Sequence, residues 1–342
     1  MTTLKQLILE KVTYSDINSN NHIEKINLND FEIGDRLYKS NIYSLYICKK
    51  IKTKKIYSLK VINKAELIKS KHVDYPLNEY QNLSSIYHPF IMEIKGINNT
   101  DPYNLYFLNE FSTGGPLKYL LKVNQLLPVE YIKFYSASII TIFDYLHKKN
   151  IIYRDLRTDN ILFNIDGYIK LSDFLLSKKL KQDFSYSLCG LPEYYPPEMI
   201  NQTGYNKSID FWQLGILLYE MSTGNLPFID SDPMKLYQKI KKGKIHFSKN
   251  INKNVKNLIK HFLNPDKNKR LGCTKKGIYE IVQHPFFENF DWEGLLHRNL
   301  KPPFIPKINQ LLFVCNYKQI EKLHLEENCV AIPKEKDPFY NW

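Results

Sequence analysis

The chain has 342 residues, of which 43% are hydrophobic and 14% aromatic, enough to bury one large core or, more in keeping with its length, two. Its 48 basic and 35 acidic residues give a net charge of +13, but the lysines are spread through almost every segment. This argues against a nucleic-acid-binding module, which has only the net charge in its favour. No apolar run reaches the length of a membrane span, so we expect no integral membrane segment.

The cysteines and the first residues bear on the compartment. Five scattered cysteines without a Cys-x-x-Cys pair favour reduced thiols over a disulfide framework or a zinc site. The start of the sequence has no signal-peptide core, and Thr2 stands where N-myristoylation requires glycine. We therefore expect a cytoplasmic protein, with nuclear entry left open.

The first third of the chain predicts mainly strands. Residues 1–30 are polar and predict an arm that packs on the body of the protein or is partly mobile. One helix is expected over residues 74–87, with Asp74 as its N-cap and Pro76 in its first turn. Short β-forming runs separated by polar turns predict an antiparallel meander with strands at residues 31–34, 43–48, 56–62, 90–97 and 105–111.

A flexible break, Ser112-Thr113-Gly114-Gly115-Pro116, separates these strands from a mainly helical region. Apolar residues at spacings of three and four predict helices over residues 131–149 and 208–223, followed by shorter amphipathic pieces to about Phe287. The sequence thus predicts a small sheet-containing part and a larger helical part.

Clustered charges interrupt the apolar stretch from Ile151 to Phe163. Charge next to β-forming residues is costly to bury unless it meets partners or ligands. Asp155 and Asn160, five residues apart on a short loop, suit a base that orients a hydroxyl and an amide that holds a metal ion. The alternative is a structural loop whose charges pair locally.

This stretch resembles the catalytic loop of protein kinases, His-Arg-Asp-x-x-x-x-Asn, with Tyr153 in the His position. Residues 31–342 resemble the AGC group, and within it most closely the cyclic-AMP-dependent kinases. The further matching motifs are Tyr-Ser-Leu-Lys60, Leu-Asn-Glu79, Ser-Asp173-Phe, Ser-Leu-Cys-Gly-Leu-Pro-Glu-Tyr, Pro-Pro-Glu198, Ile-Asp210-Phe-Trp, Lys-Arg270-Leu-Gly and Pro-Pro-Phe-Ile-Pro-Lys.

The resemblance implies an α+β, bilobal protein-kinase fold. It has a five-stranded antiparallel N-lobe sheet with one key helix, a mainly helical C-lobe and an AGC-type tail. The tail ends in a hydrophobic motif that contains Phe339 and Trp342. The expected divisions are an N-terminal arm at 1–30, the N-lobe at 31–111, the hinge at 112–116, the C-lobe at 117–287 and the tail at 288–342.

The resemblance also implies the roles of site residues. Lys60 would hold the α- and β-phosphates of ATP and Glu79 would fix Lys60, although a surface Lys–Glu pair is the alternative. Asp155 would be the catalytic base, Arg157 the catalytic-loop cation, and Asn160 and Asp173 the ligands of two Mg²⁺ ions. The other implied ATP-binding residues are Leu37, Leu45, Ser58, Asn109, Glu110, Ser112 and Leu162.

Regulatory and structural positions follow from the same resemblance. Ser187 matches the activation-loop phosphosite, with Arg154 and Lys178 as receivers of its phosphate; an unmodified serine is the alternative. The resemblance also implies a buried structural ion pair and a carboxylate that braces the catalytic loop, at Glu198, Arg270 and Asp210.

Several positions around the phosphates depart from the family pattern. Without glycines, close contact between loop amides and phosphate is in doubt. The departures are Tyr38, Ser40 and Tyr43 at the three glycines of the phosphate loop, Arg157 for lysine, Leu175 for the glycine of Asp-Phe-Gly, Leu191 for threonine, and Pro116 for an acidic hinge residue.

The resemblance therefore implies an ATP- and Mg²⁺-dependent serine/threonine protein kinase of basic-directed specificity, in cyclic-nucleotide-type signalling, whose activity the departures attenuate. Its expected partners are protein substrates and a regulatory subunit or pseudosubstrate inhibitor, with no nucleic acid. The alternative is a pseudokinase scaffold or allosteric partner with little or no phosphotransfer, whether or not it binds nucleotide.

Overall fold

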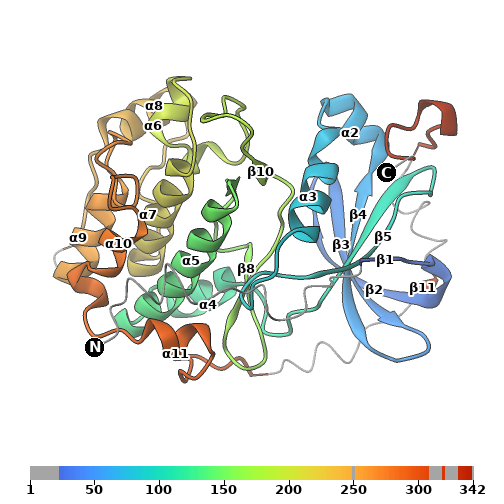
Figure 1. The fold of residues 1–342 in the computed structure, drawn as a ribbon, viewed down its shortest axis with the longest axis horizontal. Helices are drawn as coiled ribbons and strands as arrows, with labels where there is room; N and C mark the ends of the chain where they lie inside the picture. The colour runs from blue at the N-terminus through green and yellow to red at the C-terminus, as the bar shows by residue number, and fades with distance from the viewer. Residues whose placement is uncertain (1–22, 249–250, 308–317, 320–329, 341–342) are drawn as a thin grey trace. The chain divides into compact units, whose positions relative to one another are not determined.

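The computed structural model describes residues 23–248, 251–307, 318–319 and 330–340, which fall into two compact units (Figure 1). The sheet unit holds the described residues of Ile17–Tyr87, Met92–Thr113 and Ile308–Trp342. The helical unit holds those of His88–Ile91 and Gly114–Lys307. The expected N-lobe at 31–111 is therefore interrupted, because His88–Ile91 pack with the helical unit.

The sheet unit contains a seven-stranded sheet in the order β1-β5-β6-β4-β3-β2-β11. The two outermost strands, β1 and β11, are two-residue additions to the five expected strands, and β1 pairs parallel to β5. The sheet is consequently mixed rather than purely antiparallel. Its strands are β1 Glu24–Lys25, β2 Phe31–Lys39, β3 Tyr43–Lys50, β4 Ile56–Asn63, β5 Ile94–Asn98, β6 Asn104–Asn109 and β11 Lys318–Gln319.

Alternation of side chains explains how the strands pack. Phe31 and Ile33 on β2 are buried while their neighbours are partly exposed, as expected for a strand with one face on the core. The central strands β4 and β6 are buried along most of their length. Tyr46, Leu59 and Tyr106 join the β2 residues in one apolar cluster.

Two helices accompany the sheet, α2 (Lys64–Ser70) and α3 (Asp74–Ser84), so the expectation of a single helix was wrong. The expected cap of α3 was also wrong, because Val73 is the N-cap residue and its side chain makes no capping hydrogen bond. Asp74 is instead the first residue of the helix and accepts a hydrogen bond from Asn78. Pro76 does lie in the first turn, where its missing N–H costs nothing.

The helical unit is built around α5 (Val129–Lys148) and α7 (Ser208–Thr223) (Figure 1). Helix α7 is buried on almost every side, and Gly224 ends it in the left-handed conformation that favours glycine. The other helices are α4 Leu117–Asn124, α6 Pro197–Ile200, α8 Pro233–Lys242, α9 Lys253–Phe262, α10 Ile278–Val282 and α11 Trp292–Leu296.

Two small antiparallel ribbons position the loops of the helical unit. Strand β7 (Ile151–Ile152) pairs with β10 (Lys178–Lys179), and β8 (Ile161–Phe163) pairs with β9 (Ile169–Leu171). The stretch that contains Asp155 connects β7 to β8, and the stretch that contains Asp173 connects β9 to β10.

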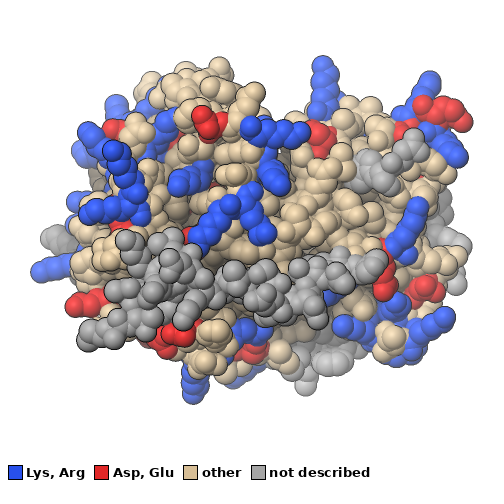
Figure 2. Space-filling model, viewed as in Figure 1, with Lys and Arg blue, Asp and Glu red and all other residues tan. Residues whose placement is uncertain are grey.

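The sheet and helical units confirm the α+β fold class that the sequence predicts. Within the described ranges, no helix is both long and apolar enough to cross a membrane. Figure 2 shows Lys and Arg side chains at many separate places on the visible face, with Asp and Glu among them, as the dispersed lysines of the sequence lead us to expect.

Candidate active site

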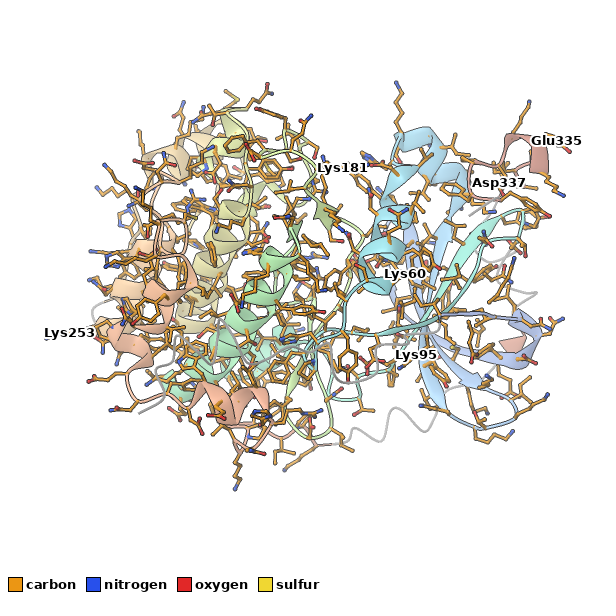
Figure 3. The ribbon with its side chains drawn as sticks, viewed as in Figure 1. Lys60, Lys95, Lys181, Lys253, Glu335 and Asp337 are labelled. Atoms are coloured by element: carbon orange, nitrogen blue, oxygen red, sulfur yellow. The ribbon has the colours of Figure 1, made fainter. Side chains whose placement is uncertain are left out.

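Lys60 and Glu79 form a buried ion pair in the sheet unit. Lys60, which Figure 3 labels, lies on β4. Its Nζ donates to both carboxylate oxygens of Glu79 on α3, at 2.9 and 2.8 Å. Both side chains are only 3% exposed. Each charge therefore depends on the other for compensation, since an unpaired buried charge is strongly destabilising. This geometry excludes the alternative of a surface Lys–Glu pair.

The other expected nucleotide-binding residues of the sheet unit lie on neighbouring strands or just after β6. Ser58 is buried on β4 and its hydroxyl donates to the backbone carbonyl of Glu110, at 3.1 Å. Asn109, the last residue of β6, is opposite Ser58 in the register. The rest are Leu37 at an exposed position of β2, Leu45 on β3 and the buried Ser112.

The loop after β7 in the helical unit has its backbone fixed by Asp210 of α7. This carboxylate accepts hydrogen bonds from the backbone N–H groups of Tyr153 and Arg154, at 3.0 and 2.8 Å, and contacts His147 Nε2 at 2.7 Å. Arg154 has a φ of 70°, a conformation that is costly for a residue with a side chain. The buried carboxylate thus holds a strained turn in place directly before Asp155.

Asp155 is oriented by Asn160. The Asn160 Nδ2 donates to Asp155 Oδ2 at 2.7 Å and to its backbone carbonyl at 2.9 Å. Arg157 Nε lies 3.6 Å from the same carboxylate oxygen. Burial raises the pKa of Asp155 to about 7, an effect that Arg157 opposes and that the nearby Asp173 carboxylate strengthens. A carboxylate with such a pKa suits proton transfer near neutral pH.

Asp173 also has a left-handed backbone, with a φ of 54°, and its carboxylate accepts from the N–H of Leu175 at 3.4 Å. The Phe174 ring is fully buried against Tyr153, with ring centroids 5.1 Å apart. Leu175 is buried and does not have the positive φ that its glycine counterpart suggests. The strained backbone conformation is therefore at Asp173 and not at Leu175, the residue that stands in place of glycine.

The donor set fits Mg²⁺ that shares its coordination shell with phosphate. Ser172 links the two expected ligands, because its N–H and its hydroxyl both donate to the Asn160 carbonyl, at 2.9 and 3.0 Å. In the part of the chain that the structure describes, no group of three or more His, Cys, Asp or Glu could hold a metal. A site with one carboxylate and one amide is instead typical of an ion whose remaining ligands are phosphate oxygens and water.

Ser187 lies within reach of a guanidinium. Arg154 Nη1 donates to the Ser187 hydroxyl and to the Tyr205 hydroxyl, both at 2.9 Å. Lys178 donates to the Ser185 hydroxyl, at 3.1 Å. Ser185 is buried and Ser187 is exposed, so the exposed hydroxyl is the one that a kinase could reach.

Further residues named from the resemblance lie at the following positions in the helical unit. Arg270 makes two hydrogen bonds to the Glu198 carboxylate, at 2.6 and 2.8 Å, with both side chains buried. Leu191 is 44% exposed. Leu162 lies on β8 and bridges to Pro116.

The end of the described chain is anchored in the sheet unit. Phe339 is fully buried, and Asn99 Nδ2 donates to its carbonyl at 3.0 Å. Sequence reasoning missed Lys64, whose Nζ lies 2.5 Å from the Asp337 carboxylate, with side-chain exposures of 0% and 2%. Figure 3 labels Asp337. No pattern pointed to this pair, because helix α2, which Lys64 begins, was itself not predicted. Trp342 lies outside the described residues.

Asp159 and Glu220 were expected to provide acidity for a basic substrate, but the cation beside Asp159 was missed. Lys118 on α4 donates to both carboxylate oxygens of Asp159, at 2.9 and 3.2 Å. Glu220 on α7 accepts hydrogen bonds from Thr158 and Tyr194, and burial raises its pKa. Asp159 therefore already has a cationic partner within the chain.

Comparison with known proteins gives consistent matches. The family model described as the protein kinase domain matches residues 31–287. The chain is 42% identical to the cAMP-dependent protein kinase catalytic subunit PRKX of Homo sapiens, over 71% of this chain and 67% of that protein. It is 36% identical to cAMP-dependent protein kinase type 3 of Saccharomyces cerevisiae, over 73% of this chain and 62% of that protein.

A third relative is the cAMP-dependent protein kinase catalytic subunit of Arthrobotrys oligospora, 39% identical over 72% of this chain and 47% of that protein. The chain spans about half the length of this relative, and somewhat less than half of two others, from Drosophila melanogaster and Dictyostelium discoideum.

Proposed function

Because the chain belongs to the protein kinase family, we propose that it transfers the γ-phosphate of ATP to serine or threonine hydroxyls of proteins, with Mg²⁺ as cofactor. The observation that carries this proposal is the partly buried Asp155 carboxylate, held at 2.7 Å by Asn160. Desolvation raises the pKa of this carboxyl to about 7, which suits a group that takes part in proton transfer and supports an enzyme over a scaffold.

The proposed roles divide the residues into three groups. Lys60, fixed by Glu79, binds ATP phosphates. Asn160 and Asp173 hold Mg²⁺, which supplies charge neutralisation at the phosphates. Asp155 orients the substrate hydroxyl and accepts its proton, and Arg157 supplies positive charge beside it.

We propose protein substrates with basic residues near the acceptor hydroxyl. Asp159 and Glu220 supply acidity for such substrates, but Lys118 already neutralises part of the Asp159 charge. The preference should therefore be weaker than two uncompensated carboxylates would give. Since the relatives are named as cAMP-dependent kinase catalytic subunits, a regulatory subunit or pseudosubstrate inhibitor is the proposed partner class.

A pseudokinase is the second candidate, and one specific observation favours it. The hairpin that replaces the glycine-rich phosphate loop satisfies its own amides: the Ser40 hydroxyl accepts from the N–H groups of Ile42 and Tyr43, at 3.3 and 3.1 Å. Phosphate oxygens would have to compete for these donors.

Steady-state phosphorylation of a basic serine peptide with Mg²⁺-ATP separates the two candidates. Wild-type protein should show turnover that disappears in Asp155→Asn. Asp144→Asn, on α5 and ion-paired with Lys148 on its own helix, is the matched control and should retain turnover. If wild type and Asp155→Asn are equally silent while ATP still raises the melting temperature, the chain is a nucleotide-binding pseudokinase. If ATP has no effect on melting either, the enzyme is refuted and a scaffold that does not bind nucleotide remains.

A further inference from the structure

Residues 38–45 form a hairpin that is closed by its own polar groups. The Ser40 N–H donates to the Tyr43 carbonyl at 2.8 Å, and the Ser40 hydroxyl donates to the same carbonyl at 3.1 Å. The same hydroxyl also accepts hydrogen bonds from two backbone N–H groups. These polar groups at the tip of the turn from β2 to β3 therefore have partners without a ligand. Tyr38, Ser40 and Tyr43 do not have a positive φ. The hairpin therefore forms without glycine at these three positions.

The register of the strands brings Tyr43 to Lys60. Leu45 on β3 lies opposite Lys60 on β4, and Tyr43 lies opposite Ile62. Because side chains two residues apart share a face, Tyr43 and Lys60 are diagonal neighbours on one face of the sheet. The Lys60 Nζ indeed lies over the Tyr43 ring, 4.5 Å from its centroid. The Tyr38 ring is 5.5 Å from that of Tyr43 and extends the aromatic cover.

Lys60 is therefore held from two sides. The Glu79 carboxylate binds its Nζ at 2.8 Å, and the electron-rich face of Tyr43 covers it from β3. At an ammonium that is 3% exposed, both interactions act with little competition from water. The Tyr43 ring thus occupies one approach to the ammonium, and a phosphate that contacts Lys60 from that side has to displace the ring.

We propose that Tyr43 is a displaceable cap on Lys60, so that the hairpin of residues 38–45 sets the affinity of the protein for nucleotide phosphates. This rests on the proposed function, in which Lys60 binds ATP. The ligand class is a nucleoside polyphosphate. The cap weakens the binding of its phosphates and leaves the binding of its base unchanged. Wild-type protein then binds ATP weakly, and a change in residue 43 that removes the ring tightens binding.

The test measures dissociation constants for Mg²⁺-ATP and for adenosine by isothermal titration calorimetry. Tyr43→Gly should bind ATP about tenfold more tightly than wild type, and Tyr43→Leu should also bind it more tightly because leucine has no cation-binding face. Tyr43→Phe keeps the ring and should match wild type. Affinity for adenosine, which has no phosphate, should be the same in all four proteins.

Tyr57→Leu is the matched control, because it removes another tyrosine ring of the same sheet that lies under a lysine, 5.6 Å from Lys55 Nζ. It should leave ATP affinity unchanged. A melting curve without ligand shows that each variant is folded, and Tyr43→Leu, which keeps an apolar side chain, covers the case in which Tyr43→Gly fails to fold.

Equal ATP affinity in wild type, Tyr43→Leu and Tyr43→Gly would overturn the cap, and so would an equal gain for adenosine. Turnover that depends on Asp155 is measured separately. If the protein transfers phosphate but substitutions of Tyr43 leave its ATP affinity unchanged, the proposed function stands and the cap is refuted. If removal of the Tyr43 ring tightens ATP binding but no turnover is seen, the cap stands and the proposed enzymatic function is refuted.

Discussion

Lys118 is a single residue that changes the charge a substrate meets beside the catalytic loop. Its ion pair with Asp159 is exposed, with side-chain exposures of 61% and 30%. We expect Lys118→Ala to raise kcat/KM for peptides with an arginine near the acceptor serine by up to about fivefold, because exposed pairs contribute about 1 kcal/mol at most. The effect should appear in KM rather than in kcat. Lys122→Ala, at an exposed position of the same helix, is the control, and an equal change in both variants would refute this role.

His88 makes the protein sensitive to acid. Burial lowers its pKa to about 3 from an ordinary value of 6.5, and its Nδ1 accepts the N–H of Phe90 at 3.1 Å. Between these two pKa values the unfolded chain binds the proton more tightly, so stability falls as the pH decreases below 6.5. The loss approaches about 1.4 kcal/mol per pH unit from this residue.

Urea unfolding of the whole chain at pH 7, 6 and 5 measures this dependence. His88→Asn, whose carbonyl can still accept the Phe90 N–H, should reduce the slope of unfolding free energy against pH. His297→Asn, at an exposed position, should leave the slope as in wild type. Identical slopes in all three proteins would show that another group causes the acid sensitivity.

Residue-level expectations succeeded where a residue's partner is part of a sequence motif and failed where the partner depends on register. Lys60 and Glu79 were paired from the motifs that contain them, and they lie 2.8 Å apart. The contact of Tyr43 with Lys60 depends on which residues of β3 and β4 face each other. A pattern of apolar residues does not fix that register, so the cap could not be predicted.

At the scale of elements, the short turn at Lys334–Lys336 and the following residues stabilise the sheet unit. We expect Phe339→Ala to lower the free energy of unfolding by about 3–5 kcal/mol, since it removes a fully buried aromatic ring. Lys64→Met should cost a similar amount, because it leaves the Asp337 carboxylate buried without its cation. Chemical denaturation with a probe in the sheet unit measures both.

Tyr340→Ala is the control for this prediction. Its ring is partly exposed and lies under Lys334, 4.4 Å from the Nζ, so its loss should cost less than about 1 kcal/mol. A large effect of Tyr340→Ala with no effect of Phe339→Ala would mean that this segment is held in another way.

The length and apolarity of a helix decided whether it could be predicted. The bounds of α7 agree with the prediction of residues 208–223, because sixteen mostly apolar residues end at a glycine. Helix α2 was missed because it has seven residues, of which only Lys64 and Leu67 are buried. Its stability comes from the Asn63 cap and from the contact of Lys64 with Asp337, which is distant in the sequence.

For the molecule as a whole, nucleotide binding should appear as thermal stabilisation that depends on metal. At a concentration 100 times its dissociation constant, Mg²⁺-ATP should stabilise the protein by about 2.7 kcal/mol. EDTA should reduce this gain, and Asp173→Asn should reduce the Mg²⁺-dependent part of it. Differential scanning calorimetry checks both. Asp266→Asn, at an exposed position, should respond like wild type, and a gain that EDTA leaves unchanged would contradict the metal role.

The two edges of the seven-stranded sheet also matter for how copies of the protein behave toward one another. A nine-residue strand such as β2 could add a strand from a second molecule through its open backbone groups. Here β11 pairs with Glu32 and Ile33, and register shifts follow between Ile33 and Tyr38, which bend the rest of the strand away from a straight edge. On the other side, β1 covers β5. Short segments outside the five central strands thus occupy part of both edges of the sheet that carries Lys60, which leaves fewer open backbone groups for a second molecule to pair with.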